Sequence, residues 1–151
     1  MTVVCVGAVV LRDDRVLLVR QAEGHALQGR WTIPWGRIAA GESPAAAVVR
    51  ETGEEAGVAV AIEGLLGVQE LPAPWEGQIG LVYLCRHAGG EPRPDEHETD
   101  AARYLSAAQI ETLGEPVEPL SRWLSCRILQ GNYTTVRQDR TNPFAPSVGF
   151  L

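Results

Sequence analysis

A dense group of carboxylates lies in the short run from Arg50 to Gly57. Its members are Glu51, Glu54 and Glu55, and on a helix Glu51 would face both of the others. Each like-charge pair costs roughly 0.2–0.5 kcal/mol on an isolated helix, and the negative end of the helix dipole near Gly57 adds to the repulsion. A divalent cation would relieve both penalties, since Mg²⁺ prefers carboxylate oxygens and commonly binds substrate phosphates as well. The spacing therefore favours a cation site, with a solvated acidic face as the structural alternative.

The flanking residues predict the helix that carries this group. Ser43 is a favourable N-cap, Pro44 suits the first helical position, and Gly57 is the expected C-cap. Between them, side chains with apolar groups recur at helical spacing and predict one buried stripe. The stripe consists of Ala45, Val48, Val49, Thr52 and Ala56. We expect the three glutamates to lie on a different face, next to a glycine-containing loop, residues 36–42, whose backbone amides can approach anionic oxygens.

Loop and helix together form a pattern with fixed spacing. It reads Gly36, five residues, Glu42, seven residues, Arg50-Glu51, two residues, Glu54-Glu55, one residue, Gly57 and Val58. This pattern resembles the Nudix box, with Thr52 at a position that is usually apolar, and a looser resemblance extends from about residue 3 to residue 113. Two positions depart from many members of that family, since Trp35 replaces a glycine and Ala39 replaces an acidic residue.

The resemblance implies roles for the residues of the box. In the Nudix family, this loop and helix hold divalent metal on a nucleoside diphosphate that is linked to another group. Glu51, Glu54 and Glu55 are then the expected metal ligands, and Glu51 is alternatively the base that polarises the attacking water. Arg50 is expected to orient a glutamate. Glu42 is expected either to join the metal ligands or to anchor the loop at the start of the helix.

Further candidates lie beside the box and beyond it. Glu98 shortly precedes an acidic-Ala-Ala-Arg-aromatic sequence. This resembles the family segment in which a loop glutamate supplies an extra metal ligand or the catalytic base. For substrate contacts we expect Gly36 and Arg37 and, because aromatic faces suit nucleobases, Trp35 and Trp75.

The implied activity is hydrolysis of a phosphoric anhydride bond with Mg²⁺ or Mn²⁺ as the cofactor. Pro74, sixteen residues past Val58, resembles a spacing associated with ADP-ribose pyrophosphatases and favours ADP-ribose or a nucleotide sugar as substrate. One alternative is a pyrophosphatase for oxidised nucleoside triphosphates. A second is a non-catalytic nucleotide-sensing module. A third is isopentenyl diphosphate isomerisation, for which no cysteine is suitably placed.

Length, net charge and hydropathy limit the kinds of partner that the protein can bind. The chain has 151 residues, which fits one domain, and a net charge of −6, which argues against general nucleic-acid or anionic-membrane binding. No apolar run approaches the roughly 20 residues needed to cross a bilayer, and the first residues lack a basic leader, so we expect a cytoplasmic protein. Cys5, Cys85 and Cys126 form no disulfide or zinc pattern.

Hydrophobic patterning predicts alternating strands and helices. Strands are expected at residues 3–11, 16–20, 31–33, 58–71 with breaks near Gly64 and Gly67, 81–86 and 101–105. Helices are expected at residues 44–56, 106–113 and 119–129, the last with Trp123 in the core. This order indicates an α/β or α+β protein. The resemblance implies an α/β/α sandwich around a mixed sheet.

The chain divides into a domain and a tail. We expect residues 1–130 to form a single Nudix domain. Residues 131–151 lack clear periodicity, but Val148, Phe150 and Leu151 are unusual in a free tail. The tail is expected to dock on the domain or on a second subunit, with a disordered terminus as the alternative. The family resemblance makes a homodimer the default.

Overall fold

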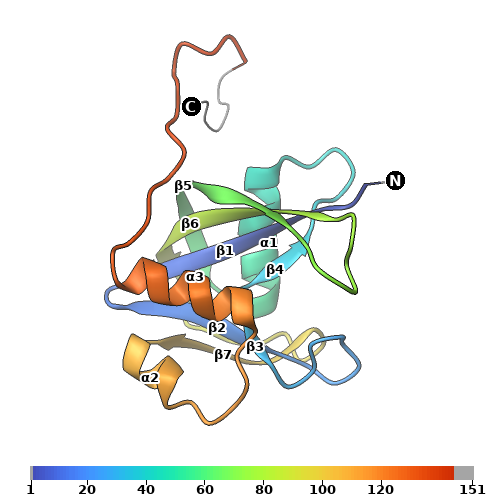
Figure 1. Cartoon of the computed structure of the whole chain (residues 1–151), viewed down its shortest axis with the longest axis vertical. Helices are drawn as coiled ribbons and strands as arrows, with labels where there is room; N and C mark the ends of the chain where they lie inside the picture. Colours follow the sequence, from blue (N-terminus) through green and yellow to red (C-terminus); the bar gives the residue numbers. More distant parts are fainter. Residues whose placement is uncertain (1, 145–151) are drawn as a thin grey trace.

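The protein is described here by a computed structural model that covers residues 2–144, so Val148, Phe150 and Leu151 lie outside the described residues. Its elements follow the chain in the order shown in Figure 1: β1 (Val4–Arg12), β2 (Arg15–Gln21), β3 (Trp31–Thr32), β4 (Trp35–Arg37), α1 (Pro44–Ala56), β5 (Ala59–Glu70), β6 (Ile79–Gly89), β7 (Thr99–Leu105), α2 (Ala107–Glu111) and α3 (Pro119–Leu129). No helix among the described residues is both long and apolar enough to cross a membrane.

The strands form one mixed sheet in the order β3-β2-β1-β6-β5, with β4 also paired to β1 and β7 to β2. Strands β1 and β6 are parallel, and the other pairs are antiparallel. The β1–β2 hairpin is paired next to its turn, at Leu11↔Val16 and Arg12↔Arg15. Further from the turn, β1 pairs with β4 and β2 pairs with β3. Strands β1 and β2 thus take different partners away from the turn, and β4 joins the sheet through its pairing with β1.

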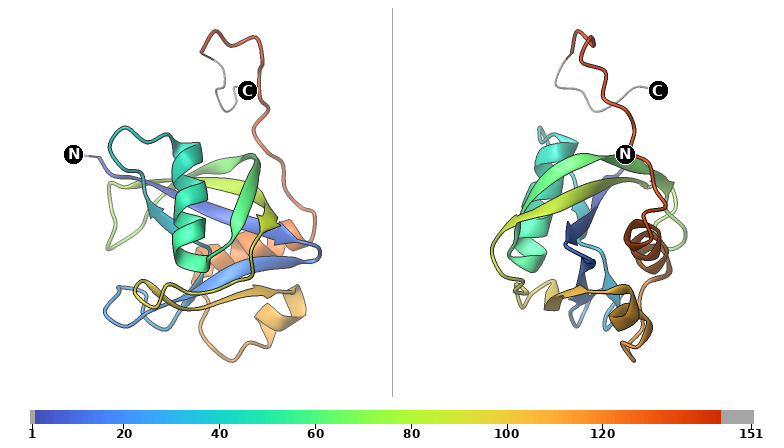
Figure 2. Two further views of the ribbon diagram at one scale, coloured as in Figure 1. Left: turned by 180° about the vertical axis from the view of Figure 1, so that it is seen from behind. Right: turned by 90° about the vertical axis from the view of Figure 1, so that its left-hand side faces the viewer.

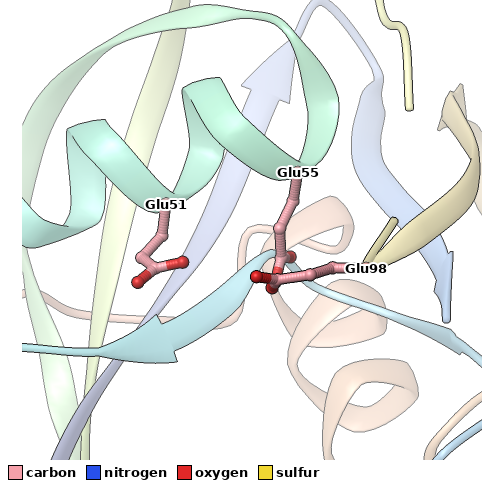
Figure 3. Close-up of side chains that lie close together, drawn as sticks. All are labelled: Glu51, Glu55 and Glu98. Carbon is pink, nitrogen blue, oxygen red and sulfur yellow. The ribbon is translucent and has the colours of Figure 1, made fainter. Parts of the chain in front are cut away.

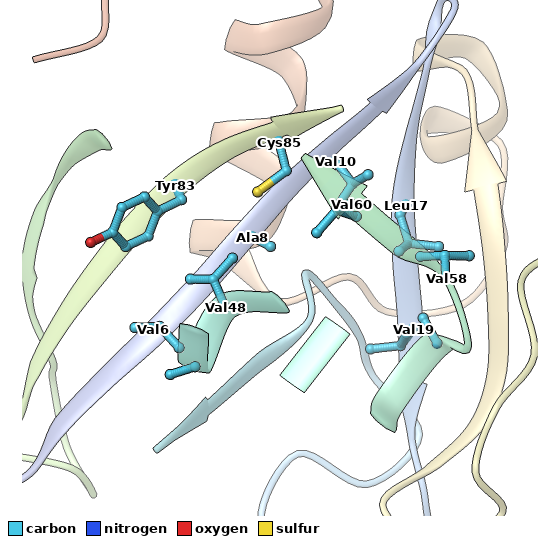
Figure 4. Packing of buried hydrophobic residues seen from close by; sticks show 12 residues of the cluster. Val6, Ala8, Val10, Leu17, Val19, Val48, Val58, Val60, Tyr83 and Cys85 are labelled. Atoms are coloured by element: carbon cyan, nitrogen blue, oxygen red, sulfur yellow. The ribbon is translucent and has the colours of Figure 1, made fainter. Parts of the chain in front are cut away.

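Helices cover both faces of the sheet. Figure 2 shows α1 on one side of the strands and α3 on the other. Alternate residues of β1 supply the two cores, because successive side chains point to opposite faces. Val6, Ala8 and Val10 face α1 in the cluster drawn in Figure 4, whereas Val9 and Leu11 belong to the cluster on the α3 side. The expected α/β/α sandwich with a mixed sheet is confirmed.

Helix α1 has the expected ends, and Val48, Thr52 and Ala56 of the expected stripe are buried. Ser43 caps its start by accepting a hydrogen bond from the Ala46 amide, and Gly57 ends it in the left-handed conformation. Glu51 and Glu55 belong to the buried side of the helix, whereas Val49 is 42% exposed. The prediction that the three glutamates lie apart from the buried stripe is therefore wrong for Glu51 and Glu55, because β4 covers that side.

Two other sequence expectations change. Strand β5 is continuous, and Gly64 and Gly67 stand at register shifts rather than at breaks, which is typical of glycines at β-bulges. Trp123 is 54% exposed and not in the core. The buried side of α3 is formed by Leu124 and Ile128, so Trp123 falls outside it.

The tryptophan of β4 is lodged in the sheet. A Cβ atom on Gly7 of β1 would lie 2.2 Å from the Trp35 ring, and one on Gly80 of β6 would lie 2.3 Å from it. Glycine weakens a strand unless something must approach closely. These two glycines therefore make the slot that holds the Trp35 ring, and the ring holds β4 against β1.

We predict that Gly80→Val destabilises the protein by about 1–3 kcal/mol, because the new side chain overlaps the Trp35 ring. Gly89→Val in the same strand is the matched control, since a Cβ there meets nothing within 4 Å. Urea unfolding of the two variants measures the difference. Equal stabilities would contradict the packing role of Trp35.

Candidate active site

Strand β4 lies directly against two glutamates of α1. The Trp35 amide donates a hydrogen bond to Oε2 of Glu55, 3.1 Å away. At the next residue, a Cβ on Gly36 would lie 2.0 Å from the carboxyl carbon of Glu51. The position of Gly36 in the box thus has a steric reason: any side chain there would displace the Glu51 carboxylate.

Three carboxylates converge at this place. Glu51 and Glu55 come from consecutive turns of α1, and Glu98 reaches them from the loop before β7 (Figure 3). One oxygen from each lies within 4.8 Å of the others. Glu51 and Glu55 are 8% and 2% exposed, whereas Glu98 is exposed. The group joins two buried acids to one that solvent can reach.

Arg50 connects the surrounding acids. Its guanidinium donates two hydrogen bonds to Glu42, at 2.7 and 2.9 Å, one to Glu51 at 2.7 Å and one to Glu54 at 3.1 Å. It also donates to the backbone oxygen of Arg37. Arg50 thereby fixes the loop after β4 to the helix and orients one carboxylate of the converging group.

Burial and charge separate the pKa values of these acids. Burial, with smaller contributions from the charges of Glu51 and Glu98, raises the pKa of Glu55 to about 9 against the hydrogen bond from the Trp35 amide. Burial also raises the pKa of Glu51, although Arg50 opposes the shift. Glu42, by contrast, is held at a pKa of about 2 by Arg50 and the Ala39 amide.

The loop that carries Glu98 is built by residues that the sequence reasoning did not single out. One Asp95 oxygen accepts hydrogen bonds from the amides of His97, Glu98 and Thr99. Burial alone would raise the pKa of Asp95, but these hydrogen bonds outweigh it and lower the pKa. The Thr99 hydroxyl donates to the backbone oxygen of Glu55, 2.6 Å away. Aspartate favours turns because its side chain accepts hydrogen bonds from the backbone amides that follow, so Asp95 was the available signal in the sequence.

The other candidates lie outside the converging group. Glu54 has a side chain that is 54% exposed and is paired with Arg50. Arg37 is exposed at the end of β4, next to the site. Trp75 is half-buried in the loop between β5 and β6, and the half-buried Trp35 ring lies against the sheet.

The converging group has the chemistry of a divalent cation site. Hard cations such as Mg²⁺ bind carboxylate oxygens, and Glu51, Glu55 and Glu98 each offer one. Among them only Glu51 has an arginine partner, so the buried Glu55 lacks a compensating positive charge. A bound cation would supply that charge and would displace the protons that the raised pKa values retain.

We predict that Glu55→Gln raises the thermal midpoint of the metal-free protein at pH 8 by about 2–4 °C. A carboxyl with a raised pKa in the folded state opposes folding as pH rises from about 4.5 toward 9, so its removal relieves that loss. Divalent metal should then raise the midpoint of the parent much more than that of the variant. Glu111→Gln, at the exposed end of α2 and outside the converging group, is the control for differential scanning calorimetry. A lower midpoint for Glu55→Gln would contradict the electrostatic assignment.

We predict a contrasting pH dependence for Glu42→Gln. The lowered pKa of Glu42 contributes stability above its unfolded value near 4.5, and this contribution disappears as pH falls toward 2. The variant should therefore be less stable than the parent at neutral pH, and the difference should shrink on acidification. Urea midpoints of both proteins from about pH 6 to pH 3 measure this convergence. A difference that is constant with pH would exclude the Arg50 pairing as its cause.

Comparison with known proteins identifies the family to which this arrangement of carboxylates belongs. The family model described as "NUDIX domain" matches residues 1–124. The chain is 35% identical over 109 residues to "Putative 8-oxo-dGTP diphosphatase 2" of Mycobacterium tuberculosis. This alignment covers 72% of this chain and 75% of the relative. It is 30% identical over 100 residues to an "ADP-ribose pyrophosphatase" of Methanocaldococcus jannaschii, covering 65% of this chain and 59% of the relative.

A solved structure agrees. The structure of a MutT NUDIX hydrolase from Burkholderia pseudomallei superposes with a TM-score of 0.70 at 29% identity, covering 89% of this chain and 99% of that one. Several curated relatives are longer, and the chain spans 63% and 31% of the length of two of them. The family model covers most of the chain and includes the whole Nudix box, so the protein belongs to the Nudix hydrolase family.

Proposed function

We propose that this protein is a pyrophosphohydrolase that cleaves a nucleoside diphosphate linked to another group, with ADP-ribose or a nucleotide sugar as the substrate class. The observation that carries the proposal is the convergence of Glu51, Glu55 and Glu98 within 4.8 Å at the end of α1. A binding module has no need to bury two like-charged carboxylates beside a third. Burying these carboxylates opposes folding when they are ionised. A function that requires their negative charge accounts for the arrangement.

The cofactor in this proposal is Mg²⁺, with Mn²⁺ as the substitute. Glu51, Glu55 and Glu98 would hold it, and Glu54 lies at the rim where a small side-chain movement would let it contribute. When bound, the cation shields the pyrophosphate charge, lowers the pKa of water and stabilises the leaving phosphate. Glu42 remains with Arg50 as the anchor of the loop, because its carboxylate is fully engaged there.

The residues of the chain would divide the remaining work. Glu98 is solvent-accessible and mounted on a loop that Asp95 stiffens, so while one of its oxygens would hold the cation, the other is placed to take the proton of the attacking water. Glu51 is the alternative base, but one of its oxygens already accepts a hydrogen bond from Arg50. Arg37, exposed at the end of β4, is a candidate to meet a phosphate oxygen, and Trp75 is a candidate to stack on the base.

The substrate class is inferred from Pro74 and from the named relatives. Pro74 has the position after the box that resembles ADP-ribose pyrophosphatases, and one relative bears that name. A second candidate is the triphosphate of an oxidised nucleoside, because another relative is named as an 8-oxo-dGTP diphosphatase. The products distinguish the two candidates. An ADP-ribose hydrolase releases AMP and ribose 5-phosphate, whereas a triphosphate pyrophosphatase releases inorganic pyrophosphate.

The proposed function is tested by offering ADP-ribose, nucleotide sugars, dinucleotides and oxidised nucleoside triphosphates to the protein with Mg²⁺. Products are identified by mass. We expect the highest kcat/KM for a diphosphate substrate, with a nucleoside monophosphate as one product. Preferential release of pyrophosphate would favour the second candidate. Tight nucleotide binding without turnover of any substrate would contradict both candidates.

We predict that Glu98→Gln lowers kcat on the best substrate by about 10²–10⁴-fold, because it removes the proposed base. Glu96→Gln is the matched control, since Glu96 lies two residues earlier in the same loop and is exposed. It should leave kcat within a factor of about two of the parent, as expected for a surface change away from the chemistry. A similar loss of kcat in both variants would assign the effect to the loop rather than to the Glu98 carboxylate.

A further inference from the structure

The segment that links β2 to β3, residues 22–30, lies beside the loop that carries Glu98 (Figure 2). Two hydrogen bonds join the segment to this loop. The Ala22 amide donates to the backbone oxygen of Glu98, 2.9 Å away, and Nε2 of His25 lies 3.1 Å from the backbone oxygen of His97. The first contact joins two backbones, whereas the second depends on one side chain. Residues 22–30 lie outside the Nudix box, so only the fold shows that they reach Glu98.

The direction of the hydrogen bond made by His25 follows from its chemistry. A backbone oxygen only accepts hydrogen bonds, so Nε2 of His25 carries a proton and donates it. Nε2 is protonated both in the neutral tautomer that has its proton there and in the imidazolium. The imidazole of His25 therefore donates to this oxygen in either charge state.

The backbone around Glu98 is held on both sides. One Asp95 oxygen accepts the amides of His97 and Glu98, at 2.9 and 2.8 Å. The backbone oxygens of the same two residues accept hydrogen bonds from His25 and Ala22. The peptide group that joins His97 to Glu98 is thus held at its oxygen by His25 and at its N–H by Asp95. An exposed loop whose backbone groups are all engaged in this way has fewer ways to move.

The 22–30 segment is itself folded by internal hydrogen bonds. The Gly24 amide donates to the side-chain oxygen of Gln28, and the Gln28 amide donates to the backbone oxygen of His25. At the end of the segment, the Gly29 amide donates to the backbone oxygen of Gln21 in β2. These contacts connect His25 to the sheet. Its imidazole can therefore hold the neighbouring loop in a fixed place rather than move with it.

We propose that His25 is a positioning residue for Glu98. Its imidazole holds the backbone next to Glu98, so that the Glu98 carboxylate stays within 4.8 Å of an oxygen of Glu51 and of Glu55. The inference rests on the proposed function, because it requires the Glu98 carboxylate to take part in the reaction. His25 itself touches no reacting atom. Without its imidazole the carboxylate is still present but is less often in place, and misplacement of a catalytic group slows the chemical step.

Steady-state kinetics at saturating Mg²⁺ on the best substrate tests the proposal. His25→Ala should lower kcat by about 3–30-fold and leave KM within a factor of about two of the parent value, because substrate binding is kept while the base is misplaced. His25→Gln should restore most of kcat, because the amide nitrogen of glutamine stands as many bonds from the backbone as Nε2. His25→Asn should not, because its nitrogen takes the position of Nδ1 instead.

Hydrogen exchange measured by NMR reports the state of the loop without any substrate. His25→Ala should lower the protection factors of the Glu98 and Thr99 amides by about 2–10-fold, as expected for the loss of one ordinary hydrogen bond. His97→Ala is the matched control, because it removes an exposed imidazole from the same contact and leaves the backbone oxygen that His25 uses. Its protection factors and kcat should stay within a factor of about two of the parent values.

The outcomes separate this inference from the proposed function. Unchanged protection in His25→Ala, or equal kcat in His25→Gln and His25→Asn, would overturn the positioning role. An unchanged kcat in His25→Ala, when Glu98→Gln is impaired, would overturn it as well and leave the proposed base intact. If Glu98→Gln instead keeps the kcat of the parent, the proposed base is wrong and the positioning role falls with it.

Discussion

The burial of two like-charged carboxylates against the backbone of a three-residue strand is the constraint on which the site depends. Glu51 rests on Gly36, and Glu55 accepts the amide of Trp35, so α1 and β4 cannot shift relative to each other without breaking the site. Burial raises the pKa of both acids, and Glu55 has no cationic partner among the described residues. The fold thus holds two carboxyl groups in a place where their ionisation opposes folding. It is stable there because neighbouring elements fix the position of each group.

Those neighbours come from distant parts of the sequence. The Trp35 ring is held by Gly7 of β1 and Gly80 of β6, which secures β4 on the sheet. Arg50 ties the loop after β4 to the helix through Glu42, and Asp95 shapes the loop that carries Glu98. Each support uses either a close contact that only glycine permits or a hydrogen-bonded charge. Side chains that look like generic loop or strand residues therefore determine the geometry of the carboxylates.

The two faces of the sheet carry different features. The α1 side carries the converging carboxylates. The α3 side carries a groove between β5 and α3, the exposed Trp123 and the departing C-terminal segment. Because the sheet stands between them, a change on the α3 side need not touch the carboxylates. The Nudix pattern lies entirely in the first of these regions.

The sequence by itself determined the family, the mixed α/β architecture, the caps of α1 and the identity of the acidic residues, because these depend on local spacing and on residue chemistry. It did not determine that Glu51 and Glu55 are buried while Glu54 is exposed, that Trp35 lies in a slot of two glycines, or that Trp123 is outside the core. Helical spacing brings all three glutamates of α1 close together. Only the position of β4 beside the helix decides which of them lose water, because burial is a property of what packs against a residue and not of its neighbours in the chain.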